Sequence, residues 1–228
     1  MRIPHIRTLL ASALALGVVA SAEAGPILRL TSSSGATQTV ADGDLADAFP
    51  TAGTVTLLGT LDATWVVNVT TGISKPTLGS ADVPELDLNS VNVSSAGGGW
   101  LDIELTDTGF TAQDAAYFLA TLGGTTSGSV SYQTYFDTSN TAFGKATELT
   151  SFSALGPAFA NTASNILSSA SLYSLTLLVR ITHTGQQASS FDAAVKVPEP
   201  GTLLLLGAGF LALATVRRRR GLRPAKAA

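Results

Sequence analysis

The sequence has 228 residues, of which 45% are hydrophobic and 13% charged, with a formal net charge of −3 and no cysteine. The absence of cysteine excludes disulfide scaffolds, thiolate metal sites and thiol catalysis. Serine and threonine together supply 52 residues and glycine another 22, a composition that favours strands and turns over helices.

The first 24 residues have the organisation of a secretory signal peptide. Arg2 and Arg7 precede an apolar stretch at 8–20, and small residues follow up to Ala22 and Ala24. Signal peptidase accepts small side chains at these two positions, so we predict a signal helix over 1–24 that is cleaved after Ala24. A short membrane anchor or a buried helix is the alternative interpretation.

Apolar and polar residues alternate with a period of two in several later segments, which is typical of half-buried strands. Between Leu88 and Val91 the alternation changes phase, which predicts a β-bulge. The last two strands flank residues 183–187 and are predicted to pair as a hairpin that leads into the C-terminal segment. The segments expected to form strands are 27–31, 54–60, 62–70, 85–93, 100–106, 130–136, 173–181 and 191–197.

One short helix is predicted near the middle of the chain, at 111–121. Thr111 can cap it, Asp114 follows three residues later, and the pair Gly123-Gly124 can end it. Eight to ten strands and one helix favour an all-β fold. We therefore predict an antiparallel, jelly-roll-like β-sandwich over residues 25–197.

The C-terminal segment combines three features in a fixed order. Pro198, Glu199 and Pro200 are followed by an apolar stretch at 201–216 and then by a cluster of arginines. As a helix the stretch would be about 24 Å long, slightly less than the ~30 Å hydrocarbon core, so we predict a short transmembrane helix. The arginines would hold its end on the cytoplasmic side as a stop-transfer cluster. They are Arg217, Arg218, Arg219 and Arg220.

This order resembles the PEP-CTERM sorting signal of Gram-negative bacteria, which marks substrates of exosortase. The resemblance covers residues 198–220 and leaves a short tail at 221–228. It implies export, transient anchoring in the inner membrane, processing near the motif by exosortase, and a final place at the cell surface or in an exopolysaccharide matrix. An ordinary single-pass anchor is the alternative.

Charge is distributed unevenly along the chain. Residues 25–200 carry five basic and fifteen acidic side chains, a net charge of −10, whereas residues 201–228 carry six basic ones. An acidic body repels phosphate backbones, so we predict no binding of nucleic acid.

The strand at 100–106 carries the side chains predicted to bind sugar. Asp102 and Glu104 alternate with the apolar face, and Trp100 lies on the same polar side. An exposed tryptophan can stack on a sugar ring while carboxylates accept hydrogen bonds from its hydroxyls. The same two carboxylates are the candidates for glycoside hydrolysis, which needs a pair about 5–10 Å apart; a solvated strand face is the alternative.

Other catalytic or metal chemistry has little support in the sequence. His183 is the one histidine outside the predicted signal peptide, and we predict a solvated turn residue without a catalytic role. No metal site or cofactor is predicted. The oxygen-rich segment Asp42-Gly43-Asp44 with Asp47 leaves calcium as an alternative to a turn or a helix cap.

We therefore predict an exported, non-enzymatic surface or matrix protein with a structural or adhesive body. Its partners would be signal peptidase, exosortase, the inner membrane transiently, and exopolysaccharide. Two alternatives remain open: a carbohydrate-binding module for the matrix polysaccharide, and a glycoside hydrolase or lyase.

Overall fold

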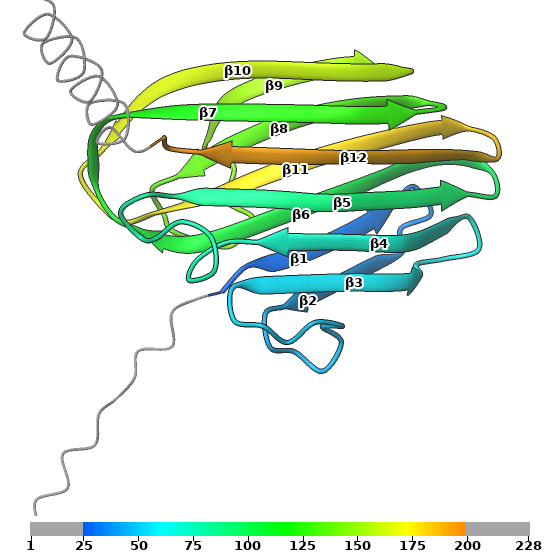
Figure 1. The fold of residues 1–228 in the computed structure, drawn as a ribbon, viewed down its shortest axis with the longest axis horizontal. Helices are drawn as coiled ribbons and strands as arrows, with labels where there is room; N and C mark the ends of the chain where they lie inside the picture. The colour runs from blue at the N-terminus through cyan, green and yellow to red at the C-terminus, as the bar shows by residue number, and fades with distance from the viewer. Residues whose placement is uncertain (1–24, 199–228) are drawn as a thin grey trace, which may run out of the picture.

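Two antiparallel six-stranded sheets stack face to face in the computed structural model, which describes residues 25–198 (Figure 1). In spatial order, sheet A contains β2 (Thr37–Ala41), β1 (Ile27–Ser32), β6 (Gly98–Phe110), β11 (Tyr173–Thr184), β8 (Ser129–Asp137) and β9 (Thr147–Leu155). Sheet B contains β10 (Ala158–Ser169), β7 (Gln113–Thr126), β12 (Gln187–Lys196), β5 (Glu85–Ser95), β4 (Trp65–Ile73) and β3 (Thr54–Thr60). The all-β antiparallel sandwich predicted from the sequence is confirmed.

The core lies between the sheets and is built from alternate residues of each long strand. Every position that the alternation assigned to the core is buried, because only one face of each strand can pack against the other sheet. A fully buried aliphatic or aromatic side chain contributes about 1.5–3 kcal/mol. These positions are Leu101, Ile103 and Leu105 of β6, Val130, Tyr132, Thr134 and Phe136 of β8, Tyr173, Leu175, Leu177, Val179 and Ile181 of β11, and Phe191, Ala193, Val195 and Val197 in and after β12.

The predicted bulge in β5 is present. The pairing of β5 with β12 shifts between Leu88 and Val91, and Ser90 has a positive φ of 56°. The extra residue turns the Ser90 amide outward, where it donates a 2.7 Å hydrogen bond to Asp192 Oδ1. The bulge therefore shapes the outer face of sheet B.

The predicted helix at 111–121 is wrong, because this segment belongs to β7, which begins at Gln113. Ala116, Phe118, Ala120 and Leu122 are buried in alternation. β7 pairs with β10 along nearly its whole length and with β12 from Leu119 onward. Burial of alternate residues and pairing with β10 outweigh the local capping pattern.

The predicted hairpin over 183–187 is also wrong, because β11 and β12 lie in different sheets. The chain turns there and crosses from sheet A to sheet B. Alternation tells which side of a strand faces the core, but not which sheet the strand joins, and that ambiguity caused the error.

A buried ion pair holds the connection between β4 and β5 against sheet A. Lys75 Nζ lies 2.9 Å from Asp107 Oδ1, and both side chains are almost fully buried. The Ser74 hydroxyl donates to the other carboxylate oxygen at 2.7 Å. Burial raises the pKa of Asp107, against the opposing effect of the Lys75 ammonium group.

Residues 25 and 198 lie at the same end of the sandwich (Figure 1), which we call the exit end. The predicted signal peptide at 1–24, the transmembrane helix at 201–216 and the arginine cluster lie outside the described residues. Within residues 25–198, no helix is long and apolar enough to cross a membrane.

Candidate functional site

The C-terminal segment leaves the body from a central strand. β12 is hydrogen-bonded to β7 and β5 as far as Lys196, which lies opposite Leu119 and Glu85. The Val197 amide then donates a 2.9 Å hydrogen bond to the Pro84 carbonyl. The chain is therefore held in place until the residue before Pro198, where the predicted motif begins; Glu199 and Pro200 lie outside the described residues.

On the outer face of sheet A, Trp100 and Asp102 are both engaged by Arg180. The guanidinium carbon of Arg180 lies 4.5 Å from the centre of the half-buried Trp100 ring. The same guanidinium donates two 2.7 Å hydrogen bonds to Asp102, and this contact raises the pKa of Arg180. The cation thus covers the ring face that would stack on a sugar.

Glu104 lies further along the same face and is only 4% exposed. Arg29 Nη2 is 2.6 Å from one of its carboxylate oxygens, and Lys145 Nζ is 2.6 Å from the other. Trp100, Asp102 and Glu104 do share one side of β6, but basic side chains occupy their contact atoms. A ligand would have to displace these cations, and sugar binding by the three residues stays a prediction.

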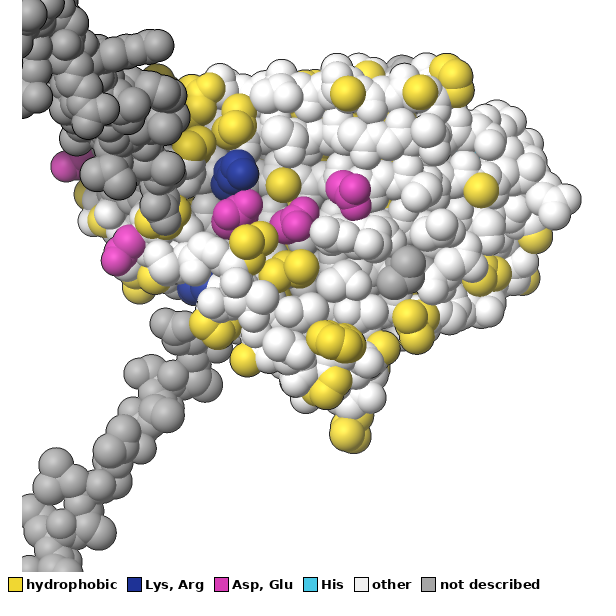
Figure 2. Space-filling view, in the orientation of Figure 1, with side chains coloured by type: hydrophobic (Ala, Val, Ile, Leu, Met, Phe, Trp, Pro, Cys, Tyr) yellow, Lys and Arg dark blue, Asp and Glu magenta, His cyan; other side chains and the backbone are white. Residues whose placement is uncertain are grey.

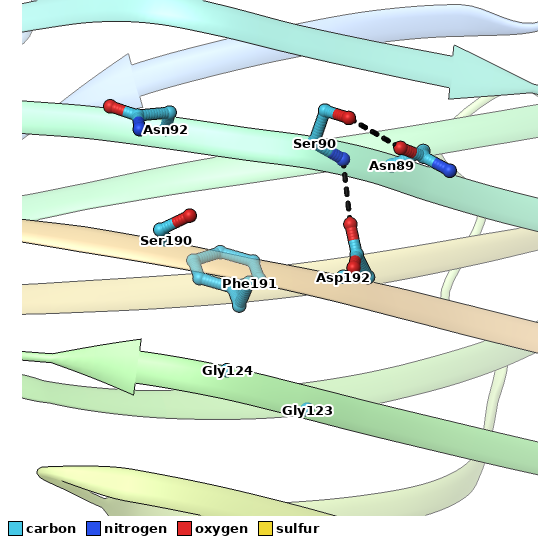
Figure 3. A pocket seen from close by; sticks show the side chains of 8 residues that line it. All are labelled: Asn89, Ser90, Asn92, Gly123, Gly124, Ser190, Phe191 and Asp192. Carbon is cyan, nitrogen blue, oxygen red and sulfur yellow. Dashed lines mark hydrogen bonds between the residues drawn. The ribbon is translucent and has the colours of Figure 1, made fainter.

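The outer face of sheet B carries a different surface, hollowed over its central strands (Figure 3). One hollow of about 440 Å³ lies over β5, β12 and β7. A second, of about 430 Å³, adjoins it and shares Asn92 and Ser190. We call the two together the sheet-B groove. The first is lined by Asn89, Ser90, Asn92, Gly123, Gly124, Ser190, Phe191 and Asp192, and the second by Asn92, Thr125, Thr126, Ser127, Pro157, Ala158, Ala188, Ser189 and Ser190.

Two adjacent glycines shape this groove in different ways. Gly123 lies opposite Asp192 on the outer side, and a Cβ there would meet only the Phe159 carbonyl at 3.8 Å. Gly124 lies opposite the inward-facing Phe191, and a Cβ there would collide with Phe191 and with the Ser190 carbonyl. Gly123 thus leaves space for a ligand, whereas Gly124 allows β7 and β12 to approach each other.

The groove offers mainly uncharged hydrogen-bonding groups. Ser90, Asn92, Ser190 and Asp192 are exposed, and Asp192 is the one charged side chain in the two lining sets. Asn92 Oδ1 accepts a 2.7 Å hydrogen bond from Asn68, which fixes its orientation. Amides, hydroxyls and a carboxylate are groups that can pair with the hydroxyls of a neutral sugar chain.

Sequence reasoning missed the groove. The signal available was the Gly123-Gly124 pair, which was interpreted as the end of a helix. The hollow depends on the register between β7 and β12, two strands about 70 residues apart, and a single sequence does not reveal that register.

His183 is 2% exposed, so the prediction of a solvated turn residue is wrong. Its ring stacks on Trp65 with centroids 5.0 Å apart. Nδ1 lies 2.7 Å from Ser95 Oγ, and Nε2 lies 2.9 Å from Ser189 Oγ. Burial lowers the pKa of His183, and the neutral ring fits between one hydroxyl that accepts and one that donates.

The acidic segment between β2 and β3 stabilises its own turn. Asp44 accepts a hydrogen bond from the Ala41 amide at 2.8 Å, Asp42 accepts from the Gly53 amide at 2.6 Å, and Asp47 accepts from the Thr56 amide at 2.9 Å. Among the described residues, no group of three or more acidic or histidine side chains is placed to hold a metal ion.

Comparison with known protein families identifies the C-terminal segment. Residues 196–220 match the PEP-CTERM protein-sorting motif. The motif implies an exported substrate of exosortase that is anchored at the cell surface, and it begins where β12 ends. No curated protein matches the sequence.

Comparison with solved structures finds distant similarities with low TM-scores. TmCBM61, in complex with β-1,4-galactotriose, has 11% identity, covers 59% of this chain and 88% of its own, and gives a TM-score of 0.33. The K1 cleaved adhesin domain of Lys-gingipain from Porphyromonas gingivalis has 13% identity, with coverage of 64% and 97% and a TM-score of 0.31. The enzymatically active domain of a bacteriophage CBA120 tailspike has 10% identity, with coverage of 65% and 20% and the same TM-score.

Proposed function

We propose that this chain is a non-enzymatic surface or matrix protein whose folded body has a structural or adhesive role. The carrying observation is the junction at Lys196, where a central strand passes directly into the sorting motif. A body held this firmly can stay folded while its C-terminal segment is in the membrane and is then cut.

The mass of the surface protein tests the processing step. We expect the full chain, expressed in a host that encodes exosortase, to appear outside the cell without its C-terminal segment, with the new end near Pro198–Pro200. In an exosortase-deficient host the same chain should keep that segment and stay with the inner membrane. Released protein that still carries residues 201–228 would contradict processing.

A carbohydrate-binding role is the second candidate, and the sheet-B groove favours it. Its lining is almost uncharged, which suits a neutral polysaccharide of the matrix better than an anionic one, because Asp192 would repel acidic sugars. The amide side chains of Asn89 and Asn92 on β5 lie beside small residues of β12 and β7, an arrangement on which an extended chain could lie flat.

Filling the groove separates this role from a purely structural one. Gly123→Tyr adds a side chain where a Cβ has room, so the fold should persist while binding to neutral glycans falls at least tenfold. The matched control is Thr182→Tyr, at an exposed position of β11 on the outer face of sheet A. A glycan array followed by titration calorimetry measures both variants, and equal affinities would contradict a role for the groove.

A further inference from the structure

Exposed apolar side chains gather at the exit end of sheet B. Tyr117 of β7 and Ile166 of β10 lie directly opposite each other, with 45% and 64% of their surfaces exposed. Leu172, in the connection from β10 to β11 at the same end, is 50% exposed. Figure 2 shows hydrophobic side chains gathered over this part of β7 and β10. Exposed apolar side chains that gather on a largely polar surface are typical of an interaction site.

The start of the sorting motif lies close to this patch. Lys196 is opposite Leu119, and Tyr117 is two residues further along the same strand, about 7 Å away along β7 and one strand spacing of about 4.8 Å across. Ile166 lies one strand further out. Both side chains therefore lie beside the point where the chain leaves the sheet.

The tether between body and apolar segment is short. Four residues, 197–200, separate Lys196 from the apolar stretch that begins at Gly201, and the five extended steps from Lys196 to Gly201 span at most about 18 Å. While residues 201–216 lie in a bilayer, the exit end must stay within that distance of the point where the stretch enters. Headgroups and interface occupy about 5–8 Å on each side of the hydrocarbon core, so the tether keeps the exit end close to the lipid surface.

We propose that the exit end of the sandwich rests on the lipid surface of the anchored precursor through Tyr117, Ile166 and Leu172. This seating depends on the membrane anchoring of 201–216 in the proposed function. Tyrosine favours the boundary between water and hydrocarbon, and the two aliphatic side chains can enter the outer acyl layer. The contact would hold residues 198–200 at the membrane surface, where a membrane-embedded protease can reach them.

The opposite end of the molecule provides a matched control. Leu58 of β3 and Val66 of β4 are also exposed, at 55% and 38%. Val66 lies opposite Ser94, which lies opposite Ala188, eight residues from Lys196 and thus about 26 Å away along the strand. When the body stands on its exit end, this end therefore lies about 26 Å further from the lipid surface.

Single-site labelling tests the seating directly, because the chain has no cysteine. Full-length I166C, Y117C and L58C variants are labelled with an environment-sensitive nitrobenzoxadiazole dye and inserted into vesicles of phosphatidylethanolamine and phosphatidylglycerol. We expect a blue-shifted emission and at least a twofold quenching by doxyl-labelled lipid at positions 117 and 166, and neither change at position 58. Circular dichroism checks that each variant folds.

The outcomes separate the seating from the anchoring. Chains that resist an alkaline wash but report equal emission at positions 166 and 58 would overturn the seating alone. Chains released by the wash would contradict the anchoring and with it the seating. A cellular test complements the labelling. The double variant I166S/L172S should slow exosortase cleavage severalfold in cells, while L58S should leave the cleavage rate unchanged.

Discussion

The outer faces of the two sheets differ in how their polar groups are used. On sheet A, Glu104 and Asp102 are bound by Arg29, Lys145 and Arg180. On sheet B, the face over β5, β12 and β7 presents amides and hydroxyls around a hollow. The carboxylate of Glu104 is buried beneath its cationic partners. Asn92 and Asp192 also bond within the fold, to Asn68 and Ser90, but both side chains stay exposed.

This difference bears on the prediction that Trp100, Asp102 and Glu104 bind sugar, which stays a prediction. In the sequence, a tryptophan and two carboxylates on one strand are the combination most typical of sugar binding. In the structure, basic side chains contact all three residues. The glycine pair had no such appearance, yet it lies in the hollow. The residue type alone therefore does not tell whether a polar side chain is exposed or is buried against partners of the same sheet.

The largest expected effect comes from the backbone beneath the groove. Gly124→Ala places a Cβ against Phe191 and the Ser190 carbonyl, so the free energy of unfolding should fall by about 3 kcal/mol. Gly123→Ala, one residue away, should change it by less than about 1 kcal/mol. Urea denaturation measures both. Similar losses at the two sites would contradict the separate roles assigned to the glycines.

Breaking the ion pairs of sheet A should cost somewhat less. Glu104→Gln leaves Arg29 and Lys145 without a charged partner, and because these side chains are 32% and 36% exposed, we expect a loss of about 1–3 kcal/mol, below that of a fully buried pair. Asp192→Asn on sheet B should cost less than about 0.5 kcal/mol. Urea denaturation measures the loss in the free energy of unfolding for both variants. Equal losses for Glu104→Gln and Asp192→Asn would contradict the contrast between the two faces.

The two sheets share a polar contact at His183, which bridges β11 to β5 and β12. Because burial lowers its pKa, the folded chain keeps the ring neutral while the unfolded chain takes up a proton near pH 6.5. Stability contributed by the neutral ring is complete above that pH and declines as the pH falls toward the folded pKa.

Thermal unfolding at pH 7 and pH 5 measures this effect. We expect the midpoint of the wild-type chain to fall by a few degrees more than that of His183→Gln, which cannot titrate there. Parallel shifts in both proteins would show that the carboxylates, not His183, control the acid response.

The smallest effect should be a gain. Burial raises the pKa of Asp87, and the nearby Asp192 and Glu85 raise it further. A carboxyl group whose pKa is higher in the folded than in the unfolded chain contributes less to the free energy of unfolding as the pH rises above its unfolded pKa, near 4. Asp87→Asn should therefore raise the free energy of unfolding at pH 7 by about 0.5 kcal/mol, and the gain should vanish at pH 3.5. A loss at pH 7 would contradict the repulsion.

The sequence predicted strands well where alternation was strong. Tyr173 to Ile181 and Leu101 to Leu105 alternate cleanly, and both columns are buried. β10 was missed because its exposed edge is rich in serine, alanine and asparagine and lacks a regular apolar face. In β7 the local capping pattern predicts a helix, whereas the alternation of Phe118, Ala120 and Leu122 indicates a strand, and the strand is what forms.

The sorting motif and the groove lie at opposite limits of what a sequence reveals. The sorting motif is a linear pattern of consecutive residues, so their order alone was sufficient to predict it. The groove needs Gly123 beside Asp192 and a bulge at Ser90, and those neighbours come from three separate parts of the chain. Registers between distant strands are set by the packed core as a whole.

The central position of β12 also determines how the body responds to mechanical force. Tension applied through the C-terminal segment acts along the strand axis, while the hydrogen bonds to β5 and β7 run across it on both sides. These bonds are loaded in shear and must rupture together, whereas a strand pulled sideways from an edge would peel away one bond at a time. A surface protein attached in this way can withstand drag from flowing liquid without unravelling from its point of attachment.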